Sequence, residues 1–194
     1  LAGHLEVKDF ALMAPRATSH SWYPYSFLTI PAQNEPWLTS ALDLLSDIVN
    51  DIVTKGISKE NIYFLGFSQG ACLTLEFVTR HATKYGGVVA FTGGLIGDKI
   101  YSENYSGDFL GTPVFIGTSD PDPHVPVGRV NESAAILEKM NAAVTKNIYK
   151  NMGLEAEYGF RKTFYDNFDG VNDKINPEPN DKARLYNNDW YTFA

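Results

Sequence analysis

Cysteine is nearly absent from this chain, and long apolar runs are missing. The 194 residues contain one cysteine, Cys72, so no disulfide can form within the chain. A single thiol is typical of a protein from a reducing compartment, which favours a cytoplasmic location. No apolar run approaches the ~20 residues that a membrane-spanning helix needs, and the first residues lack the basic and apolar regions of a signal peptide. We therefore expect no membrane span.

Positive charge is also scarce. The chain has 16 Lys and Arg against 23 Asp and Glu, a net charge of -7, and no basic block offsets this balance. Binding to nucleic acid or to an anionic membrane is therefore disfavoured, and a small-molecule or acyl substrate fits better. The length and the 44% hydrophobic content predict one domain with a substantial core.

Residues 62–71, IYFLGFSQGA, carry the strongest functional signal. Four strand-forming residues run into a Gly-x-Ser-x-Gly turn, and a helical pattern follows at once. Side chains at positions 66 and 70 would collide where the strand and helix cross, which explains the two glycines. A chance match of this short motif has no reason to fall between a strand and a helix. We therefore predict Ser68 as a nucleophile, with a merely structural turn as the alternative.

Strand-like and helix-like patterns alternate along most of the chain. Strands are predicted at residues 10–15, 62–65, 87–91, 112–117 and 144–149, and helices at 38–52, after Ser68 and at 130–143, with the end of a helix at 1–9. This alternation predicts an α/β fold, a mainly parallel sheet with helices on both faces. The aromatic loop at 18–37 is either a cover over the core or one wall of a substrate groove.

Active sites of such sheets lie beyond the carboxyl ends of the strands. Ser68 follows one predicted strand, and Asp120 and Asp122 follow another. Because these strand ends meet at one edge of the sheet, we expect the serine and a carboxylate to converge. Cys72 lies one helical turn past Ser68 and is interpreted as a small buried residue and not as a second nucleophile.

Four segments together resemble the phospholipase/carboxylesterase family of α/β-hydrolases, which includes acyl-protein thioesterases. They are Ala14-Pro15-Arg16, Gly66-Phe67-Ser68-Gln69-Gly70-Ala71, Thr92-Gly93-Gly94-Leu95 and Asp122-Pro123-His124-Val125-Pro126. The resemblance covers residues 1–153. It implies a serine hydrolase for carboxylic esters or thioesters, carboxylesterase-like or lysophospholipase-like, with no cofactor, no metal and a small-molecule or lipid-like acyl ester as substrate.

The same resemblance implies the roles of three residues. Ser68 would be the nucleophile, Asp122 the carboxylate that orients an imidazole, and the backbone N–H of Gln69 one oxyanion donor. Asp120 is the alternative acid. The second oxyanion donor comes, in the family, from a first strand and a His-Gly-rich loop that this chain does not contain, so we expect a fold that is incomplete at both ends.

The expected catalytic histidine is also missing. Family members place it just after a Tyr-x-x-Met-Gly segment, whereas here Tyr149-Lys150-Asn151-Met152-Gly153 is followed by Leu154. Of the four histidines, His4 and His81 are predicted on the surface. His124 remains as a possible base, and His20 and Trp22, in the aromatic loop, as possible substrate contacts.

Residues 154–194 do not resemble the family, so we predict a domain at 1–153 and an atypical tail at 154–194. Two further interpretations stay open beside an impaired hydrolase. The chain could be a non-catalytic ligand-binding protein on a hydrolase scaffold, or a truncated or recombined hydrolase.

Overall fold

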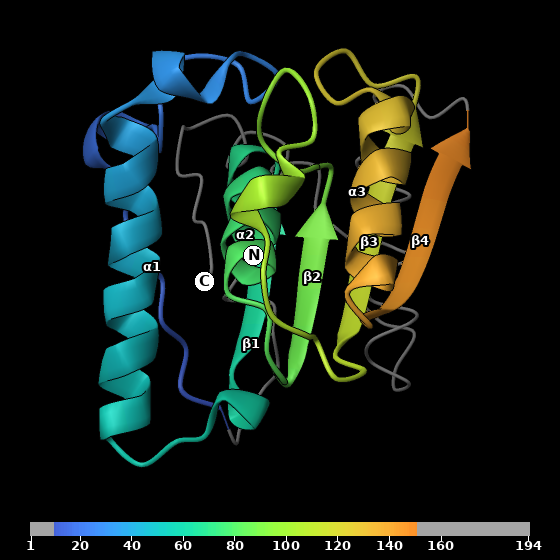
Figure 1. The fold of residues 1–194 in the computed structure, drawn as a ribbon. Coiled ribbons are helices and arrows are strands. Elements are labelled where there is room, and N and C mark those ends of the chain that lie inside the picture. Colours follow the sequence, from blue (N-terminus) through green and yellow to red (C-terminus); the bar gives the residue numbers. More distant parts are fainter. Residues whose placement is uncertain (1–9, 151–194) are drawn as a thin grey trace, which may run out of the picture.

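The computed structural model describes residues 10–150, which form a four-stranded parallel sheet with helices packed beside it (Figure 1). The strands are β1 (Tyr63–Phe67), β2 (Gly87–Phe91), β3 (Pro113–Asp120) and β4 (Ala143–Lys150). They lie in the order β1-β2-β3-β4, and each runs parallel to its neighbour. The predicted α/β fold class with a parallel sheet is therefore confirmed.

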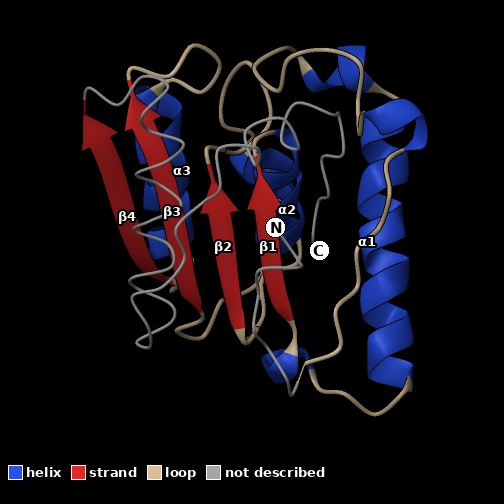
Figure 2. Cartoon of the chain, turned by 180° about the vertical axis from the view of Figure 1, so that it is seen from behind, coloured by secondary structure: helices blue, strands red, loops and turns tan. Residues whose placement is uncertain are grey.

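The three helices predicted within the described residues are all formed. They are α1 (Trp37–Thr54), α2 (Gln69–Arg80) and α3 (Val127–Lys139), with short 3-10 turns η2 (Thr18–His20), η3 (Pro31–Asn34), η4 (Lys59–Asn61) and η5 (Ser102–Asn104). Helices α2 and α3 lie behind the strands in Figure 2, on the same face of the sheet. A helical layer on the second face stays a prediction. The helix end predicted at residues 1–9 lies outside the described residues.

Helix α1 is amphipathic, and its apolar positions recur at three- and four-residue steps. Five of them are buried, namely Leu38, Ala41, Leu42, Leu45 and Val49. This face joins the core, but its main contacts among the described elements are with α2 and η3. Figure 1 shows α1 beside α2, beyond the edge strand β1. The apolar period of residues 38–52 predicts a helix that packs on the sheet; the helix is formed, but it packs mainly on α2 and η3.

The predicted strand at residues 10–15 is not formed. The segment has no regular structure, and Phe10, Leu12 and Met13 are 50%, 50% and 40% exposed. A strand requires a partner for its backbone hydrogen bonds. None of the four described strands pairs with this segment, although Phe10 does stack edge-on against Tyr63 of β1, with 5.3 Å between the ring centroids. Apolar content alone could not show that the partner is lacking.

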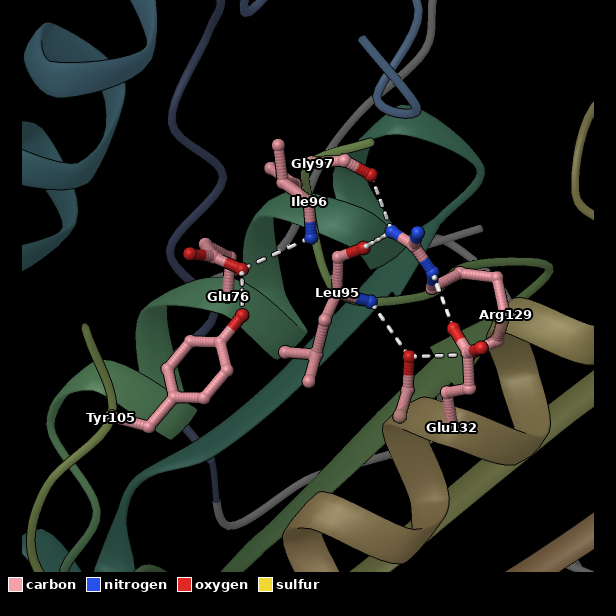
Figure 3. Close-up of polar contacts among 8 residues, drawn as sticks. Glu76, Leu95, Ile96, Gly97, Tyr105, Arg129 and Glu132 are labelled. Atoms are coloured by element: carbon pink, nitrogen blue, oxygen red, sulfur yellow. Dashed lines mark hydrogen bonds and ion pairs between the residues drawn. The ribbon is translucent and has the colours of Figure 1, made fainter. Parts of the chain in front are cut away.

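A buried carboxylate holds the chain that follows β2. Glu76 of α2 is 1% exposed, and its Oε2 accepts the backbone N–H of Ile96 and the hydroxyl of Tyr105, both at 3.0 Å (Figure 3). Its Oε1 pairs with Nε of Arg80 at 2.8 Å. Burial and the neighbouring carboxylate raise the pKa of Tyr105 well above its ordinary value. Because all of these groups are partnered, the buried charge is compatible with a stable core.

Arg129 of α3 holds the same loop from the other side. Its Nη1 donates to the backbone oxygens of Leu95, at 2.9 Å, and Gly97, at 2.5 Å (Figure 3). The hydroxyl of Ser133 accepts the N–H of Leu95 at 2.9 Å. These bonds join α2, α3 and the loop after β2, so the sheet edge at which β1 and β3 end has a rigid support.

Candidate active site

Ser68 stands alone between β1, which ends at Phe67, and α2, which begins at Gln69. Its backbone has φ 52° and ψ -119°, a conformation that costs energy for any residue with a side chain. The Ser68 N–H donates to the oxygen of Phe91 at 2.8 Å, and the Ser68 oxygen accepts the N–H of Cys72 at 3.0 Å. The strained turn is therefore fixed both to strand β2 and to the first turn of α2.

Close packing around this turn explains its glycines. A Cβ added to Gly66 would lie 2.6 Å from the carbonyl carbon of Gly70 and 2.7 Å from the Cα of Ala71. A Cβ on Gly93 would lie 2.9 Å from the backbone nitrogen of Cys72. Backbone atoms cannot move aside as a flexible side chain can, so the predicted collision is confirmed for Gly66. Gly93, in the loop after β2, serves the same purpose.

Gln69 opens α2, so its N–H is among the first-turn donors that have no partner within the helix. Its side chain turns to the aromatic loop. The Oε1 accepts the backbone N–H of Trp22 at 2.9 Å, and the Nε2 donates to the backbone oxygen of Tyr23 at 2.8 Å. No local sequence pattern indicates this side-chain role, because the two partners lie 47 and 46 residues earlier in the chain.

Asp122 lies in the loop between β3 and α3, at the same sheet edge as Ser68. Its Oδ1 accepts the backbone N–H groups of His124, at 2.8 Å, and Val125, at 2.7 Å. Its Oδ2 accepts the hydroxyl of Ser119 at 3.2 Å. Asp120 is the last residue of β3, where it pairs in register with Lys150 of β4. Both carboxylates therefore lie at the edge where β1 ends, as predicted, but β3 runs three residues past its predicted end at 117, so Asp120 belongs to the strand and only Asp122 follows it.

A pocket of about 180 Å³ opens at this edge. Nine residues line it, from three parts of the chain: Tyr23, Tyr25, Ser26, Phe27, Ser68, Gln69, Cys72, His124 and Val125. Four of them belong to the aromatic loop, which thus forms one wall of the pocket as well as covering the core with Trp22. The loop therefore covers the core with some side chains and lines a pocket with others, and the binding of substrate in that pocket stays a prediction.

Comparison with known proteins decides the family. The model of the phospholipase/carboxylesterase family matches residues 10–162. The chain belongs to this family. It is 33% identical to acyl-protein thioesterase 1 of Saccharomyces cerevisiae over 125 residues, which are 64% of this chain and 53% of that protein. It is 35% identical to the protein of that name from Kluyveromyces lactis over 106 residues, 53% of this chain and 45% of that one. The chain thus spans about half the length of the curated relatives it matches.

A solved member of the family gives a structural comparison. The phospholipase/carboxylesterase from Dyadobacter fermentans is 54% identical, with a TM-score of 0.73 over 79% of this chain and 73% of that one. The SOBER1 protein of Arabidopsis thaliana in its F65L form is 18% identical with a TM-score of 0.58 over 81% of each chain, which shows the fold alone. The resemblance inferred from the four sequence segments is therefore confirmed at the level of family and fold.

The pocket brings together some of the predicted site residues of this family member and not others. Ser68, Gln69 and His124 all line it, whereas Asp122 lies outside its lining and supports the loop that carries His124. His20 is exposed in η2 and is not a lining residue. Trp22 is 7% exposed and belongs to the core. A direct pocket contact is therefore observed for His124 but not for His20 or Trp22.

Cys72 lines the pocket, yet its thiol is not a competing nucleophile. The residue is fully buried in α2, and burial raises the pKa of the Cys72 thiol to about 12. The thiolate is the nucleophilic form, so the thiol is inert near neutral pH. The interpretation of Cys72 as a small buried residue is correct, and its position one turn after Ser68 explains why it reaches the pocket.

Within residues 10–150, no imidazole forms a hydrogen bond with Asp122. His81 is exposed and caps the end of α2 opposite to Ser68, about 18 Å away for a helix of 12 residues. Its pKa is lowered by burial first and by Lys59 and Arg80 next. His4 and Leu154 lie outside the described residues.

Within residues 10–150, no cluster of His, Cys, Asp or Glu could hold a metal ion, and no helix is long and apolar enough to cross a membrane.

Proposed function

We propose that this chain is a serine hydrolase that acts on carboxylic esters or thioesters through an acyl-serine intermediate. One observation carries the proposal: Ser68 stands on a strained strand-to-helix turn at the wall of a pocket, next to the first N–H groups of α2. Membership of the phospholipase/carboxylesterase family supports it. The relatives named acyl-protein thioesterase and probable carboxylesterase support thioesters and esters as the substrate class.

The proposed reaction uses Ser68 as the attacking group. The Ser68 Oγ forms a bond to the acyl carbon while a base takes the hydroxyl proton, and the carbonyl oxygen becomes an oxyanion facing the Gln69 N–H. The tetrahedral intermediate collapses and releases the alcohol or thiol, which receives the proton. Water then attacks the acyl carbon and gives one proton to the base, the bond from that carbon to the Ser68 Oγ breaks, and the base returns the proton to Oγ as the carboxylic acid leaves. Strain at Ser68 and the free donors of α2 are present before substrate arrives, so neither has to be assembled during the reaction.

Asp122 is proposed to orient the base. Its Oδ1 accepts two backbone N–H groups, whereas among residues 10–150 its Oδ2 accepts one hydrogen bond, from the Ser119 hydroxyl. A carboxylate oxygen can accept a second hydrogen bond, so Oδ2 is the atom that an imidazole N–H would meet. Asp120 stays the alternative acid. His124 is the described imidazole-bearing residue that shares the pocket with Ser68, and we propose it as a substitute base or a substrate contact.

Covalent labelling of Ser68 and an ester hydrolysis assay together test the proposed function. The full chain is incubated with a fluorophosphonate probe and, separately, with p-nitrophenyl butyrate. We expect slow but measurable labelling and hydrolysis, both lost in Ser68→Ala, with Ser40→Ala, at an exposed position of α1, as the control that leaves both unchanged. Equal background rates in the native chain and in Ser68→Ala would overturn the proposal. Fractionation of the cells that make the protein tests the proposed cytoplasmic location.

A second function is favoured by the surroundings of Asp122. Within the described residues its carboxylate holds a loop and no imidazole, and Leu154 stands where the family's histidine is expected. A protein that binds acyl compounds without turning them over would have these features. Saturable binding of a non-hydrolysable alkyl ketone, together with absence of Ser68 labelling, would support this candidate over the hydrolase.

A further inference from the structure

The aromatic wall of the pocket is held by core packing and by a small set of hydrogen bonds. Tyr23, Tyr25, Ser26 and Phe27 supply four of the nine lining residues, and their segment contains no helix or strand. Tyr23 and Phe27 pack into the core, and hydrogen bonds of the loop backbone add to this packing. The orientation of the wall relative to Ser68 therefore depends on these bonds as well as on core packing.

The bond pair closest to the nucleophile comes from Gln69. Its amide accepts from the N–H of Trp22 at 2.9 Å and donates to the oxygen of Tyr23 at 2.8 Å, so one side chain engages two consecutive residues of the loop. The hydroxyl of Ser21 adds to this arrangement, 3.3 Å from the Gln69 Nε2 and 2.7 Å from the oxygen of Tyr23. Two opposite bonds fix both the distance and the rotation of the segment.

The remaining anchors lie farther along the loop. Asn34 is fully buried, and its amide accepts the N–H of Tyr25 at 2.8 Å and donates to the oxygen of Ser26 at 3.2 Å. The oxygen of Phe27 accepts the N–H of Gly97 at 2.7 Å. These bonds shape the loop, but neither Asn34 nor Gly97 is bonded to the Ser68 turn in these contacts. Among these anchors, Gln69 is the one that adjoins Ser68 in the chain, so its side chain links the wall directly to the Ser68 turn.

We propose that the Gln69 side chain is a positioning residue that sets the distance between Ser68 and the aromatic wall, and thereby the length of acyl group that the pocket accepts. This inference rests on the proposed function. Because the backbone N–H of Gln69 is the proposed oxyanion donor, the same residue would place the reacting carbonyl and the wall that the acyl chain meets. A change of its side chain would alter acyl-length selectivity while leaving the backbone donor in place.

The variant Gln69→Met separates the two roles. Methionine has a similar length and cannot hydrogen-bond to Trp22 or Tyr23, and its backbone N–H is unchanged. Gln33→Met makes the same chemical change at an exposed position of η3 and is the matched control. Gln69→Glu is a milder second variant, because its carboxylate still accepts from Trp22 but cannot donate to Tyr23.

The readout is the ratio of kcat/KM for p-nitrophenyl butyrate to that for p-nitrophenyl acetate, measured on the full chain. A loss of folded protein lowers both values equally and leaves this ratio unchanged, so the ratio reports the wall and not stability. We expect Gln69→Met to lower the ratio by about fivefold or more, Gln69→Glu by less, and Gln33→Met to leave it unchanged. Amide exchange followed by mass spectrometry should show faster exchange for the peptide that contains Trp22.

The possible outcomes separate the positioning role of Gln69 from the proposed hydrolase function. An unchanged ratio or unchanged exchange in Gln69→Met, in a chain whose Ser68 is still labelled, overturns the positioning role and leaves the proposed function standing. If the native chain itself is not labelled at Ser68 and hydrolyses neither ester, the proposed function fails and this inference fails with it.

Discussion

The carboxylate of Asp122 accepts the backbone N–H of His124 at 2.8 Å, and both belong to the loop that closes the end of β3. The bond bends the loop so that His124 faces the pocket that Ser68 also lines. Asp122 therefore has a structural task that does not depend on catalysis. Any experiment on this carboxylate must distinguish the shape of the loop from the orientation of a base.

The variant Asp122→Asn makes that distinction. Its amide oxygen can still accept the N–H groups of His124 and Val125, so we expect the loop and the stability to be retained while the negative charge is lost. If Asp122 orients a base, turnover should fall by up to about 10⁴, as for the carboxylate of a serine protease triad. Hydrolysis of p-nitrophenyl butyrate and thermal unfolding are the two measurements. Asp120→Asn is the control, and a loss of activity there with none in Asp122→Asn would assign the role to the other carboxylate.

The buried face of α1 predicts a large effect on stability. Leu45 has no exposed surface, so Leu45→Ala should lower the free energy of unfolding by about 2 to 5 kcal/mol through lost burial and a cavity. Leu44, its neighbour, is 37% exposed and serves as the control, with an expected change below about 0.5 kcal/mol for Leu44→Ala. Urea unfolding measures both. Similar losses in the two variants would contradict the burial of Leu45 and the exposure of Leu44 on α1.

Local patterns predicted most of the fold, and the reason is visible in the elements that succeeded. The strand at residues 87–91 was predicted with its observed bounds, because a buried apolar run ends there at Thr92-Gly93-Gly94. Helix α3 begins three residues before its predicted start of 130 and ends four residues before 143, since Pro126 and Met140 cap it and no apolar period marks such ends. Residues 10–15 failed because pairing is not a local property.

The candidate site was predictable only where a motif fixes the backbone. Ser68, Gly66 and the position of Asp122 follow from short patterns with a steric or topological meaning. The Gln69 side chain bonds to Tyr23, which lies 46 residues earlier in the chain, so no periodicity could indicate this contact. The same holds for Phe27, whose backbone oxygen bonds to the loop after β2. The predicted domain boundary at 153 and the tail at 154–194 lie outside the described residues and stay predictions.

The thiol of Cys72 predicts how stability depends on pH. Burial raises its pKa from 9.0 to about 12, so the folded protein holds the thiol proton more tightly than the unfolded chain does. The resulting stabilisation is fully present below pH 9 and is lost as pH rises from about 9 to about 12, with a slope of up to about 1.4 kcal/mol per pH unit. Urea unfolding of the native chain and Cys72→Ala between pH 8 and pH 11 measures it. Parallel pH profiles for the two proteins would contradict the predicted contribution.

Restoration of a histidine tests why this chain would be a slow hydrolase. Strand β4 ends at Lys150, which pairs with Asp120 at the edge where β1 delivers Ser68. Position 154 follows four residues later, within about 14 Å of that strand end even for an extended chain. We predict that an imidazole at position 154 comes within reach of both Asp122 and Ser68. We therefore expect Leu154→His to raise the rate of fluorophosphonate labelling by about 10²-fold or more, the usual contribution of a general base.

The matched control for this prediction is Leu154→Gln, which adds a polar side chain of similar size but no base and should label as slowly as the native chain. Adding Ser68→Ala to Leu154→His should abolish the labelling, which assigns the gained reactivity to Ser68. The native chain decides the other direction. Rapid, stoichiometric labelling without any substitution would mean that a proton acceptor is already in place, and His124 would then be the first residue to replace, because it shares the pocket with the serine.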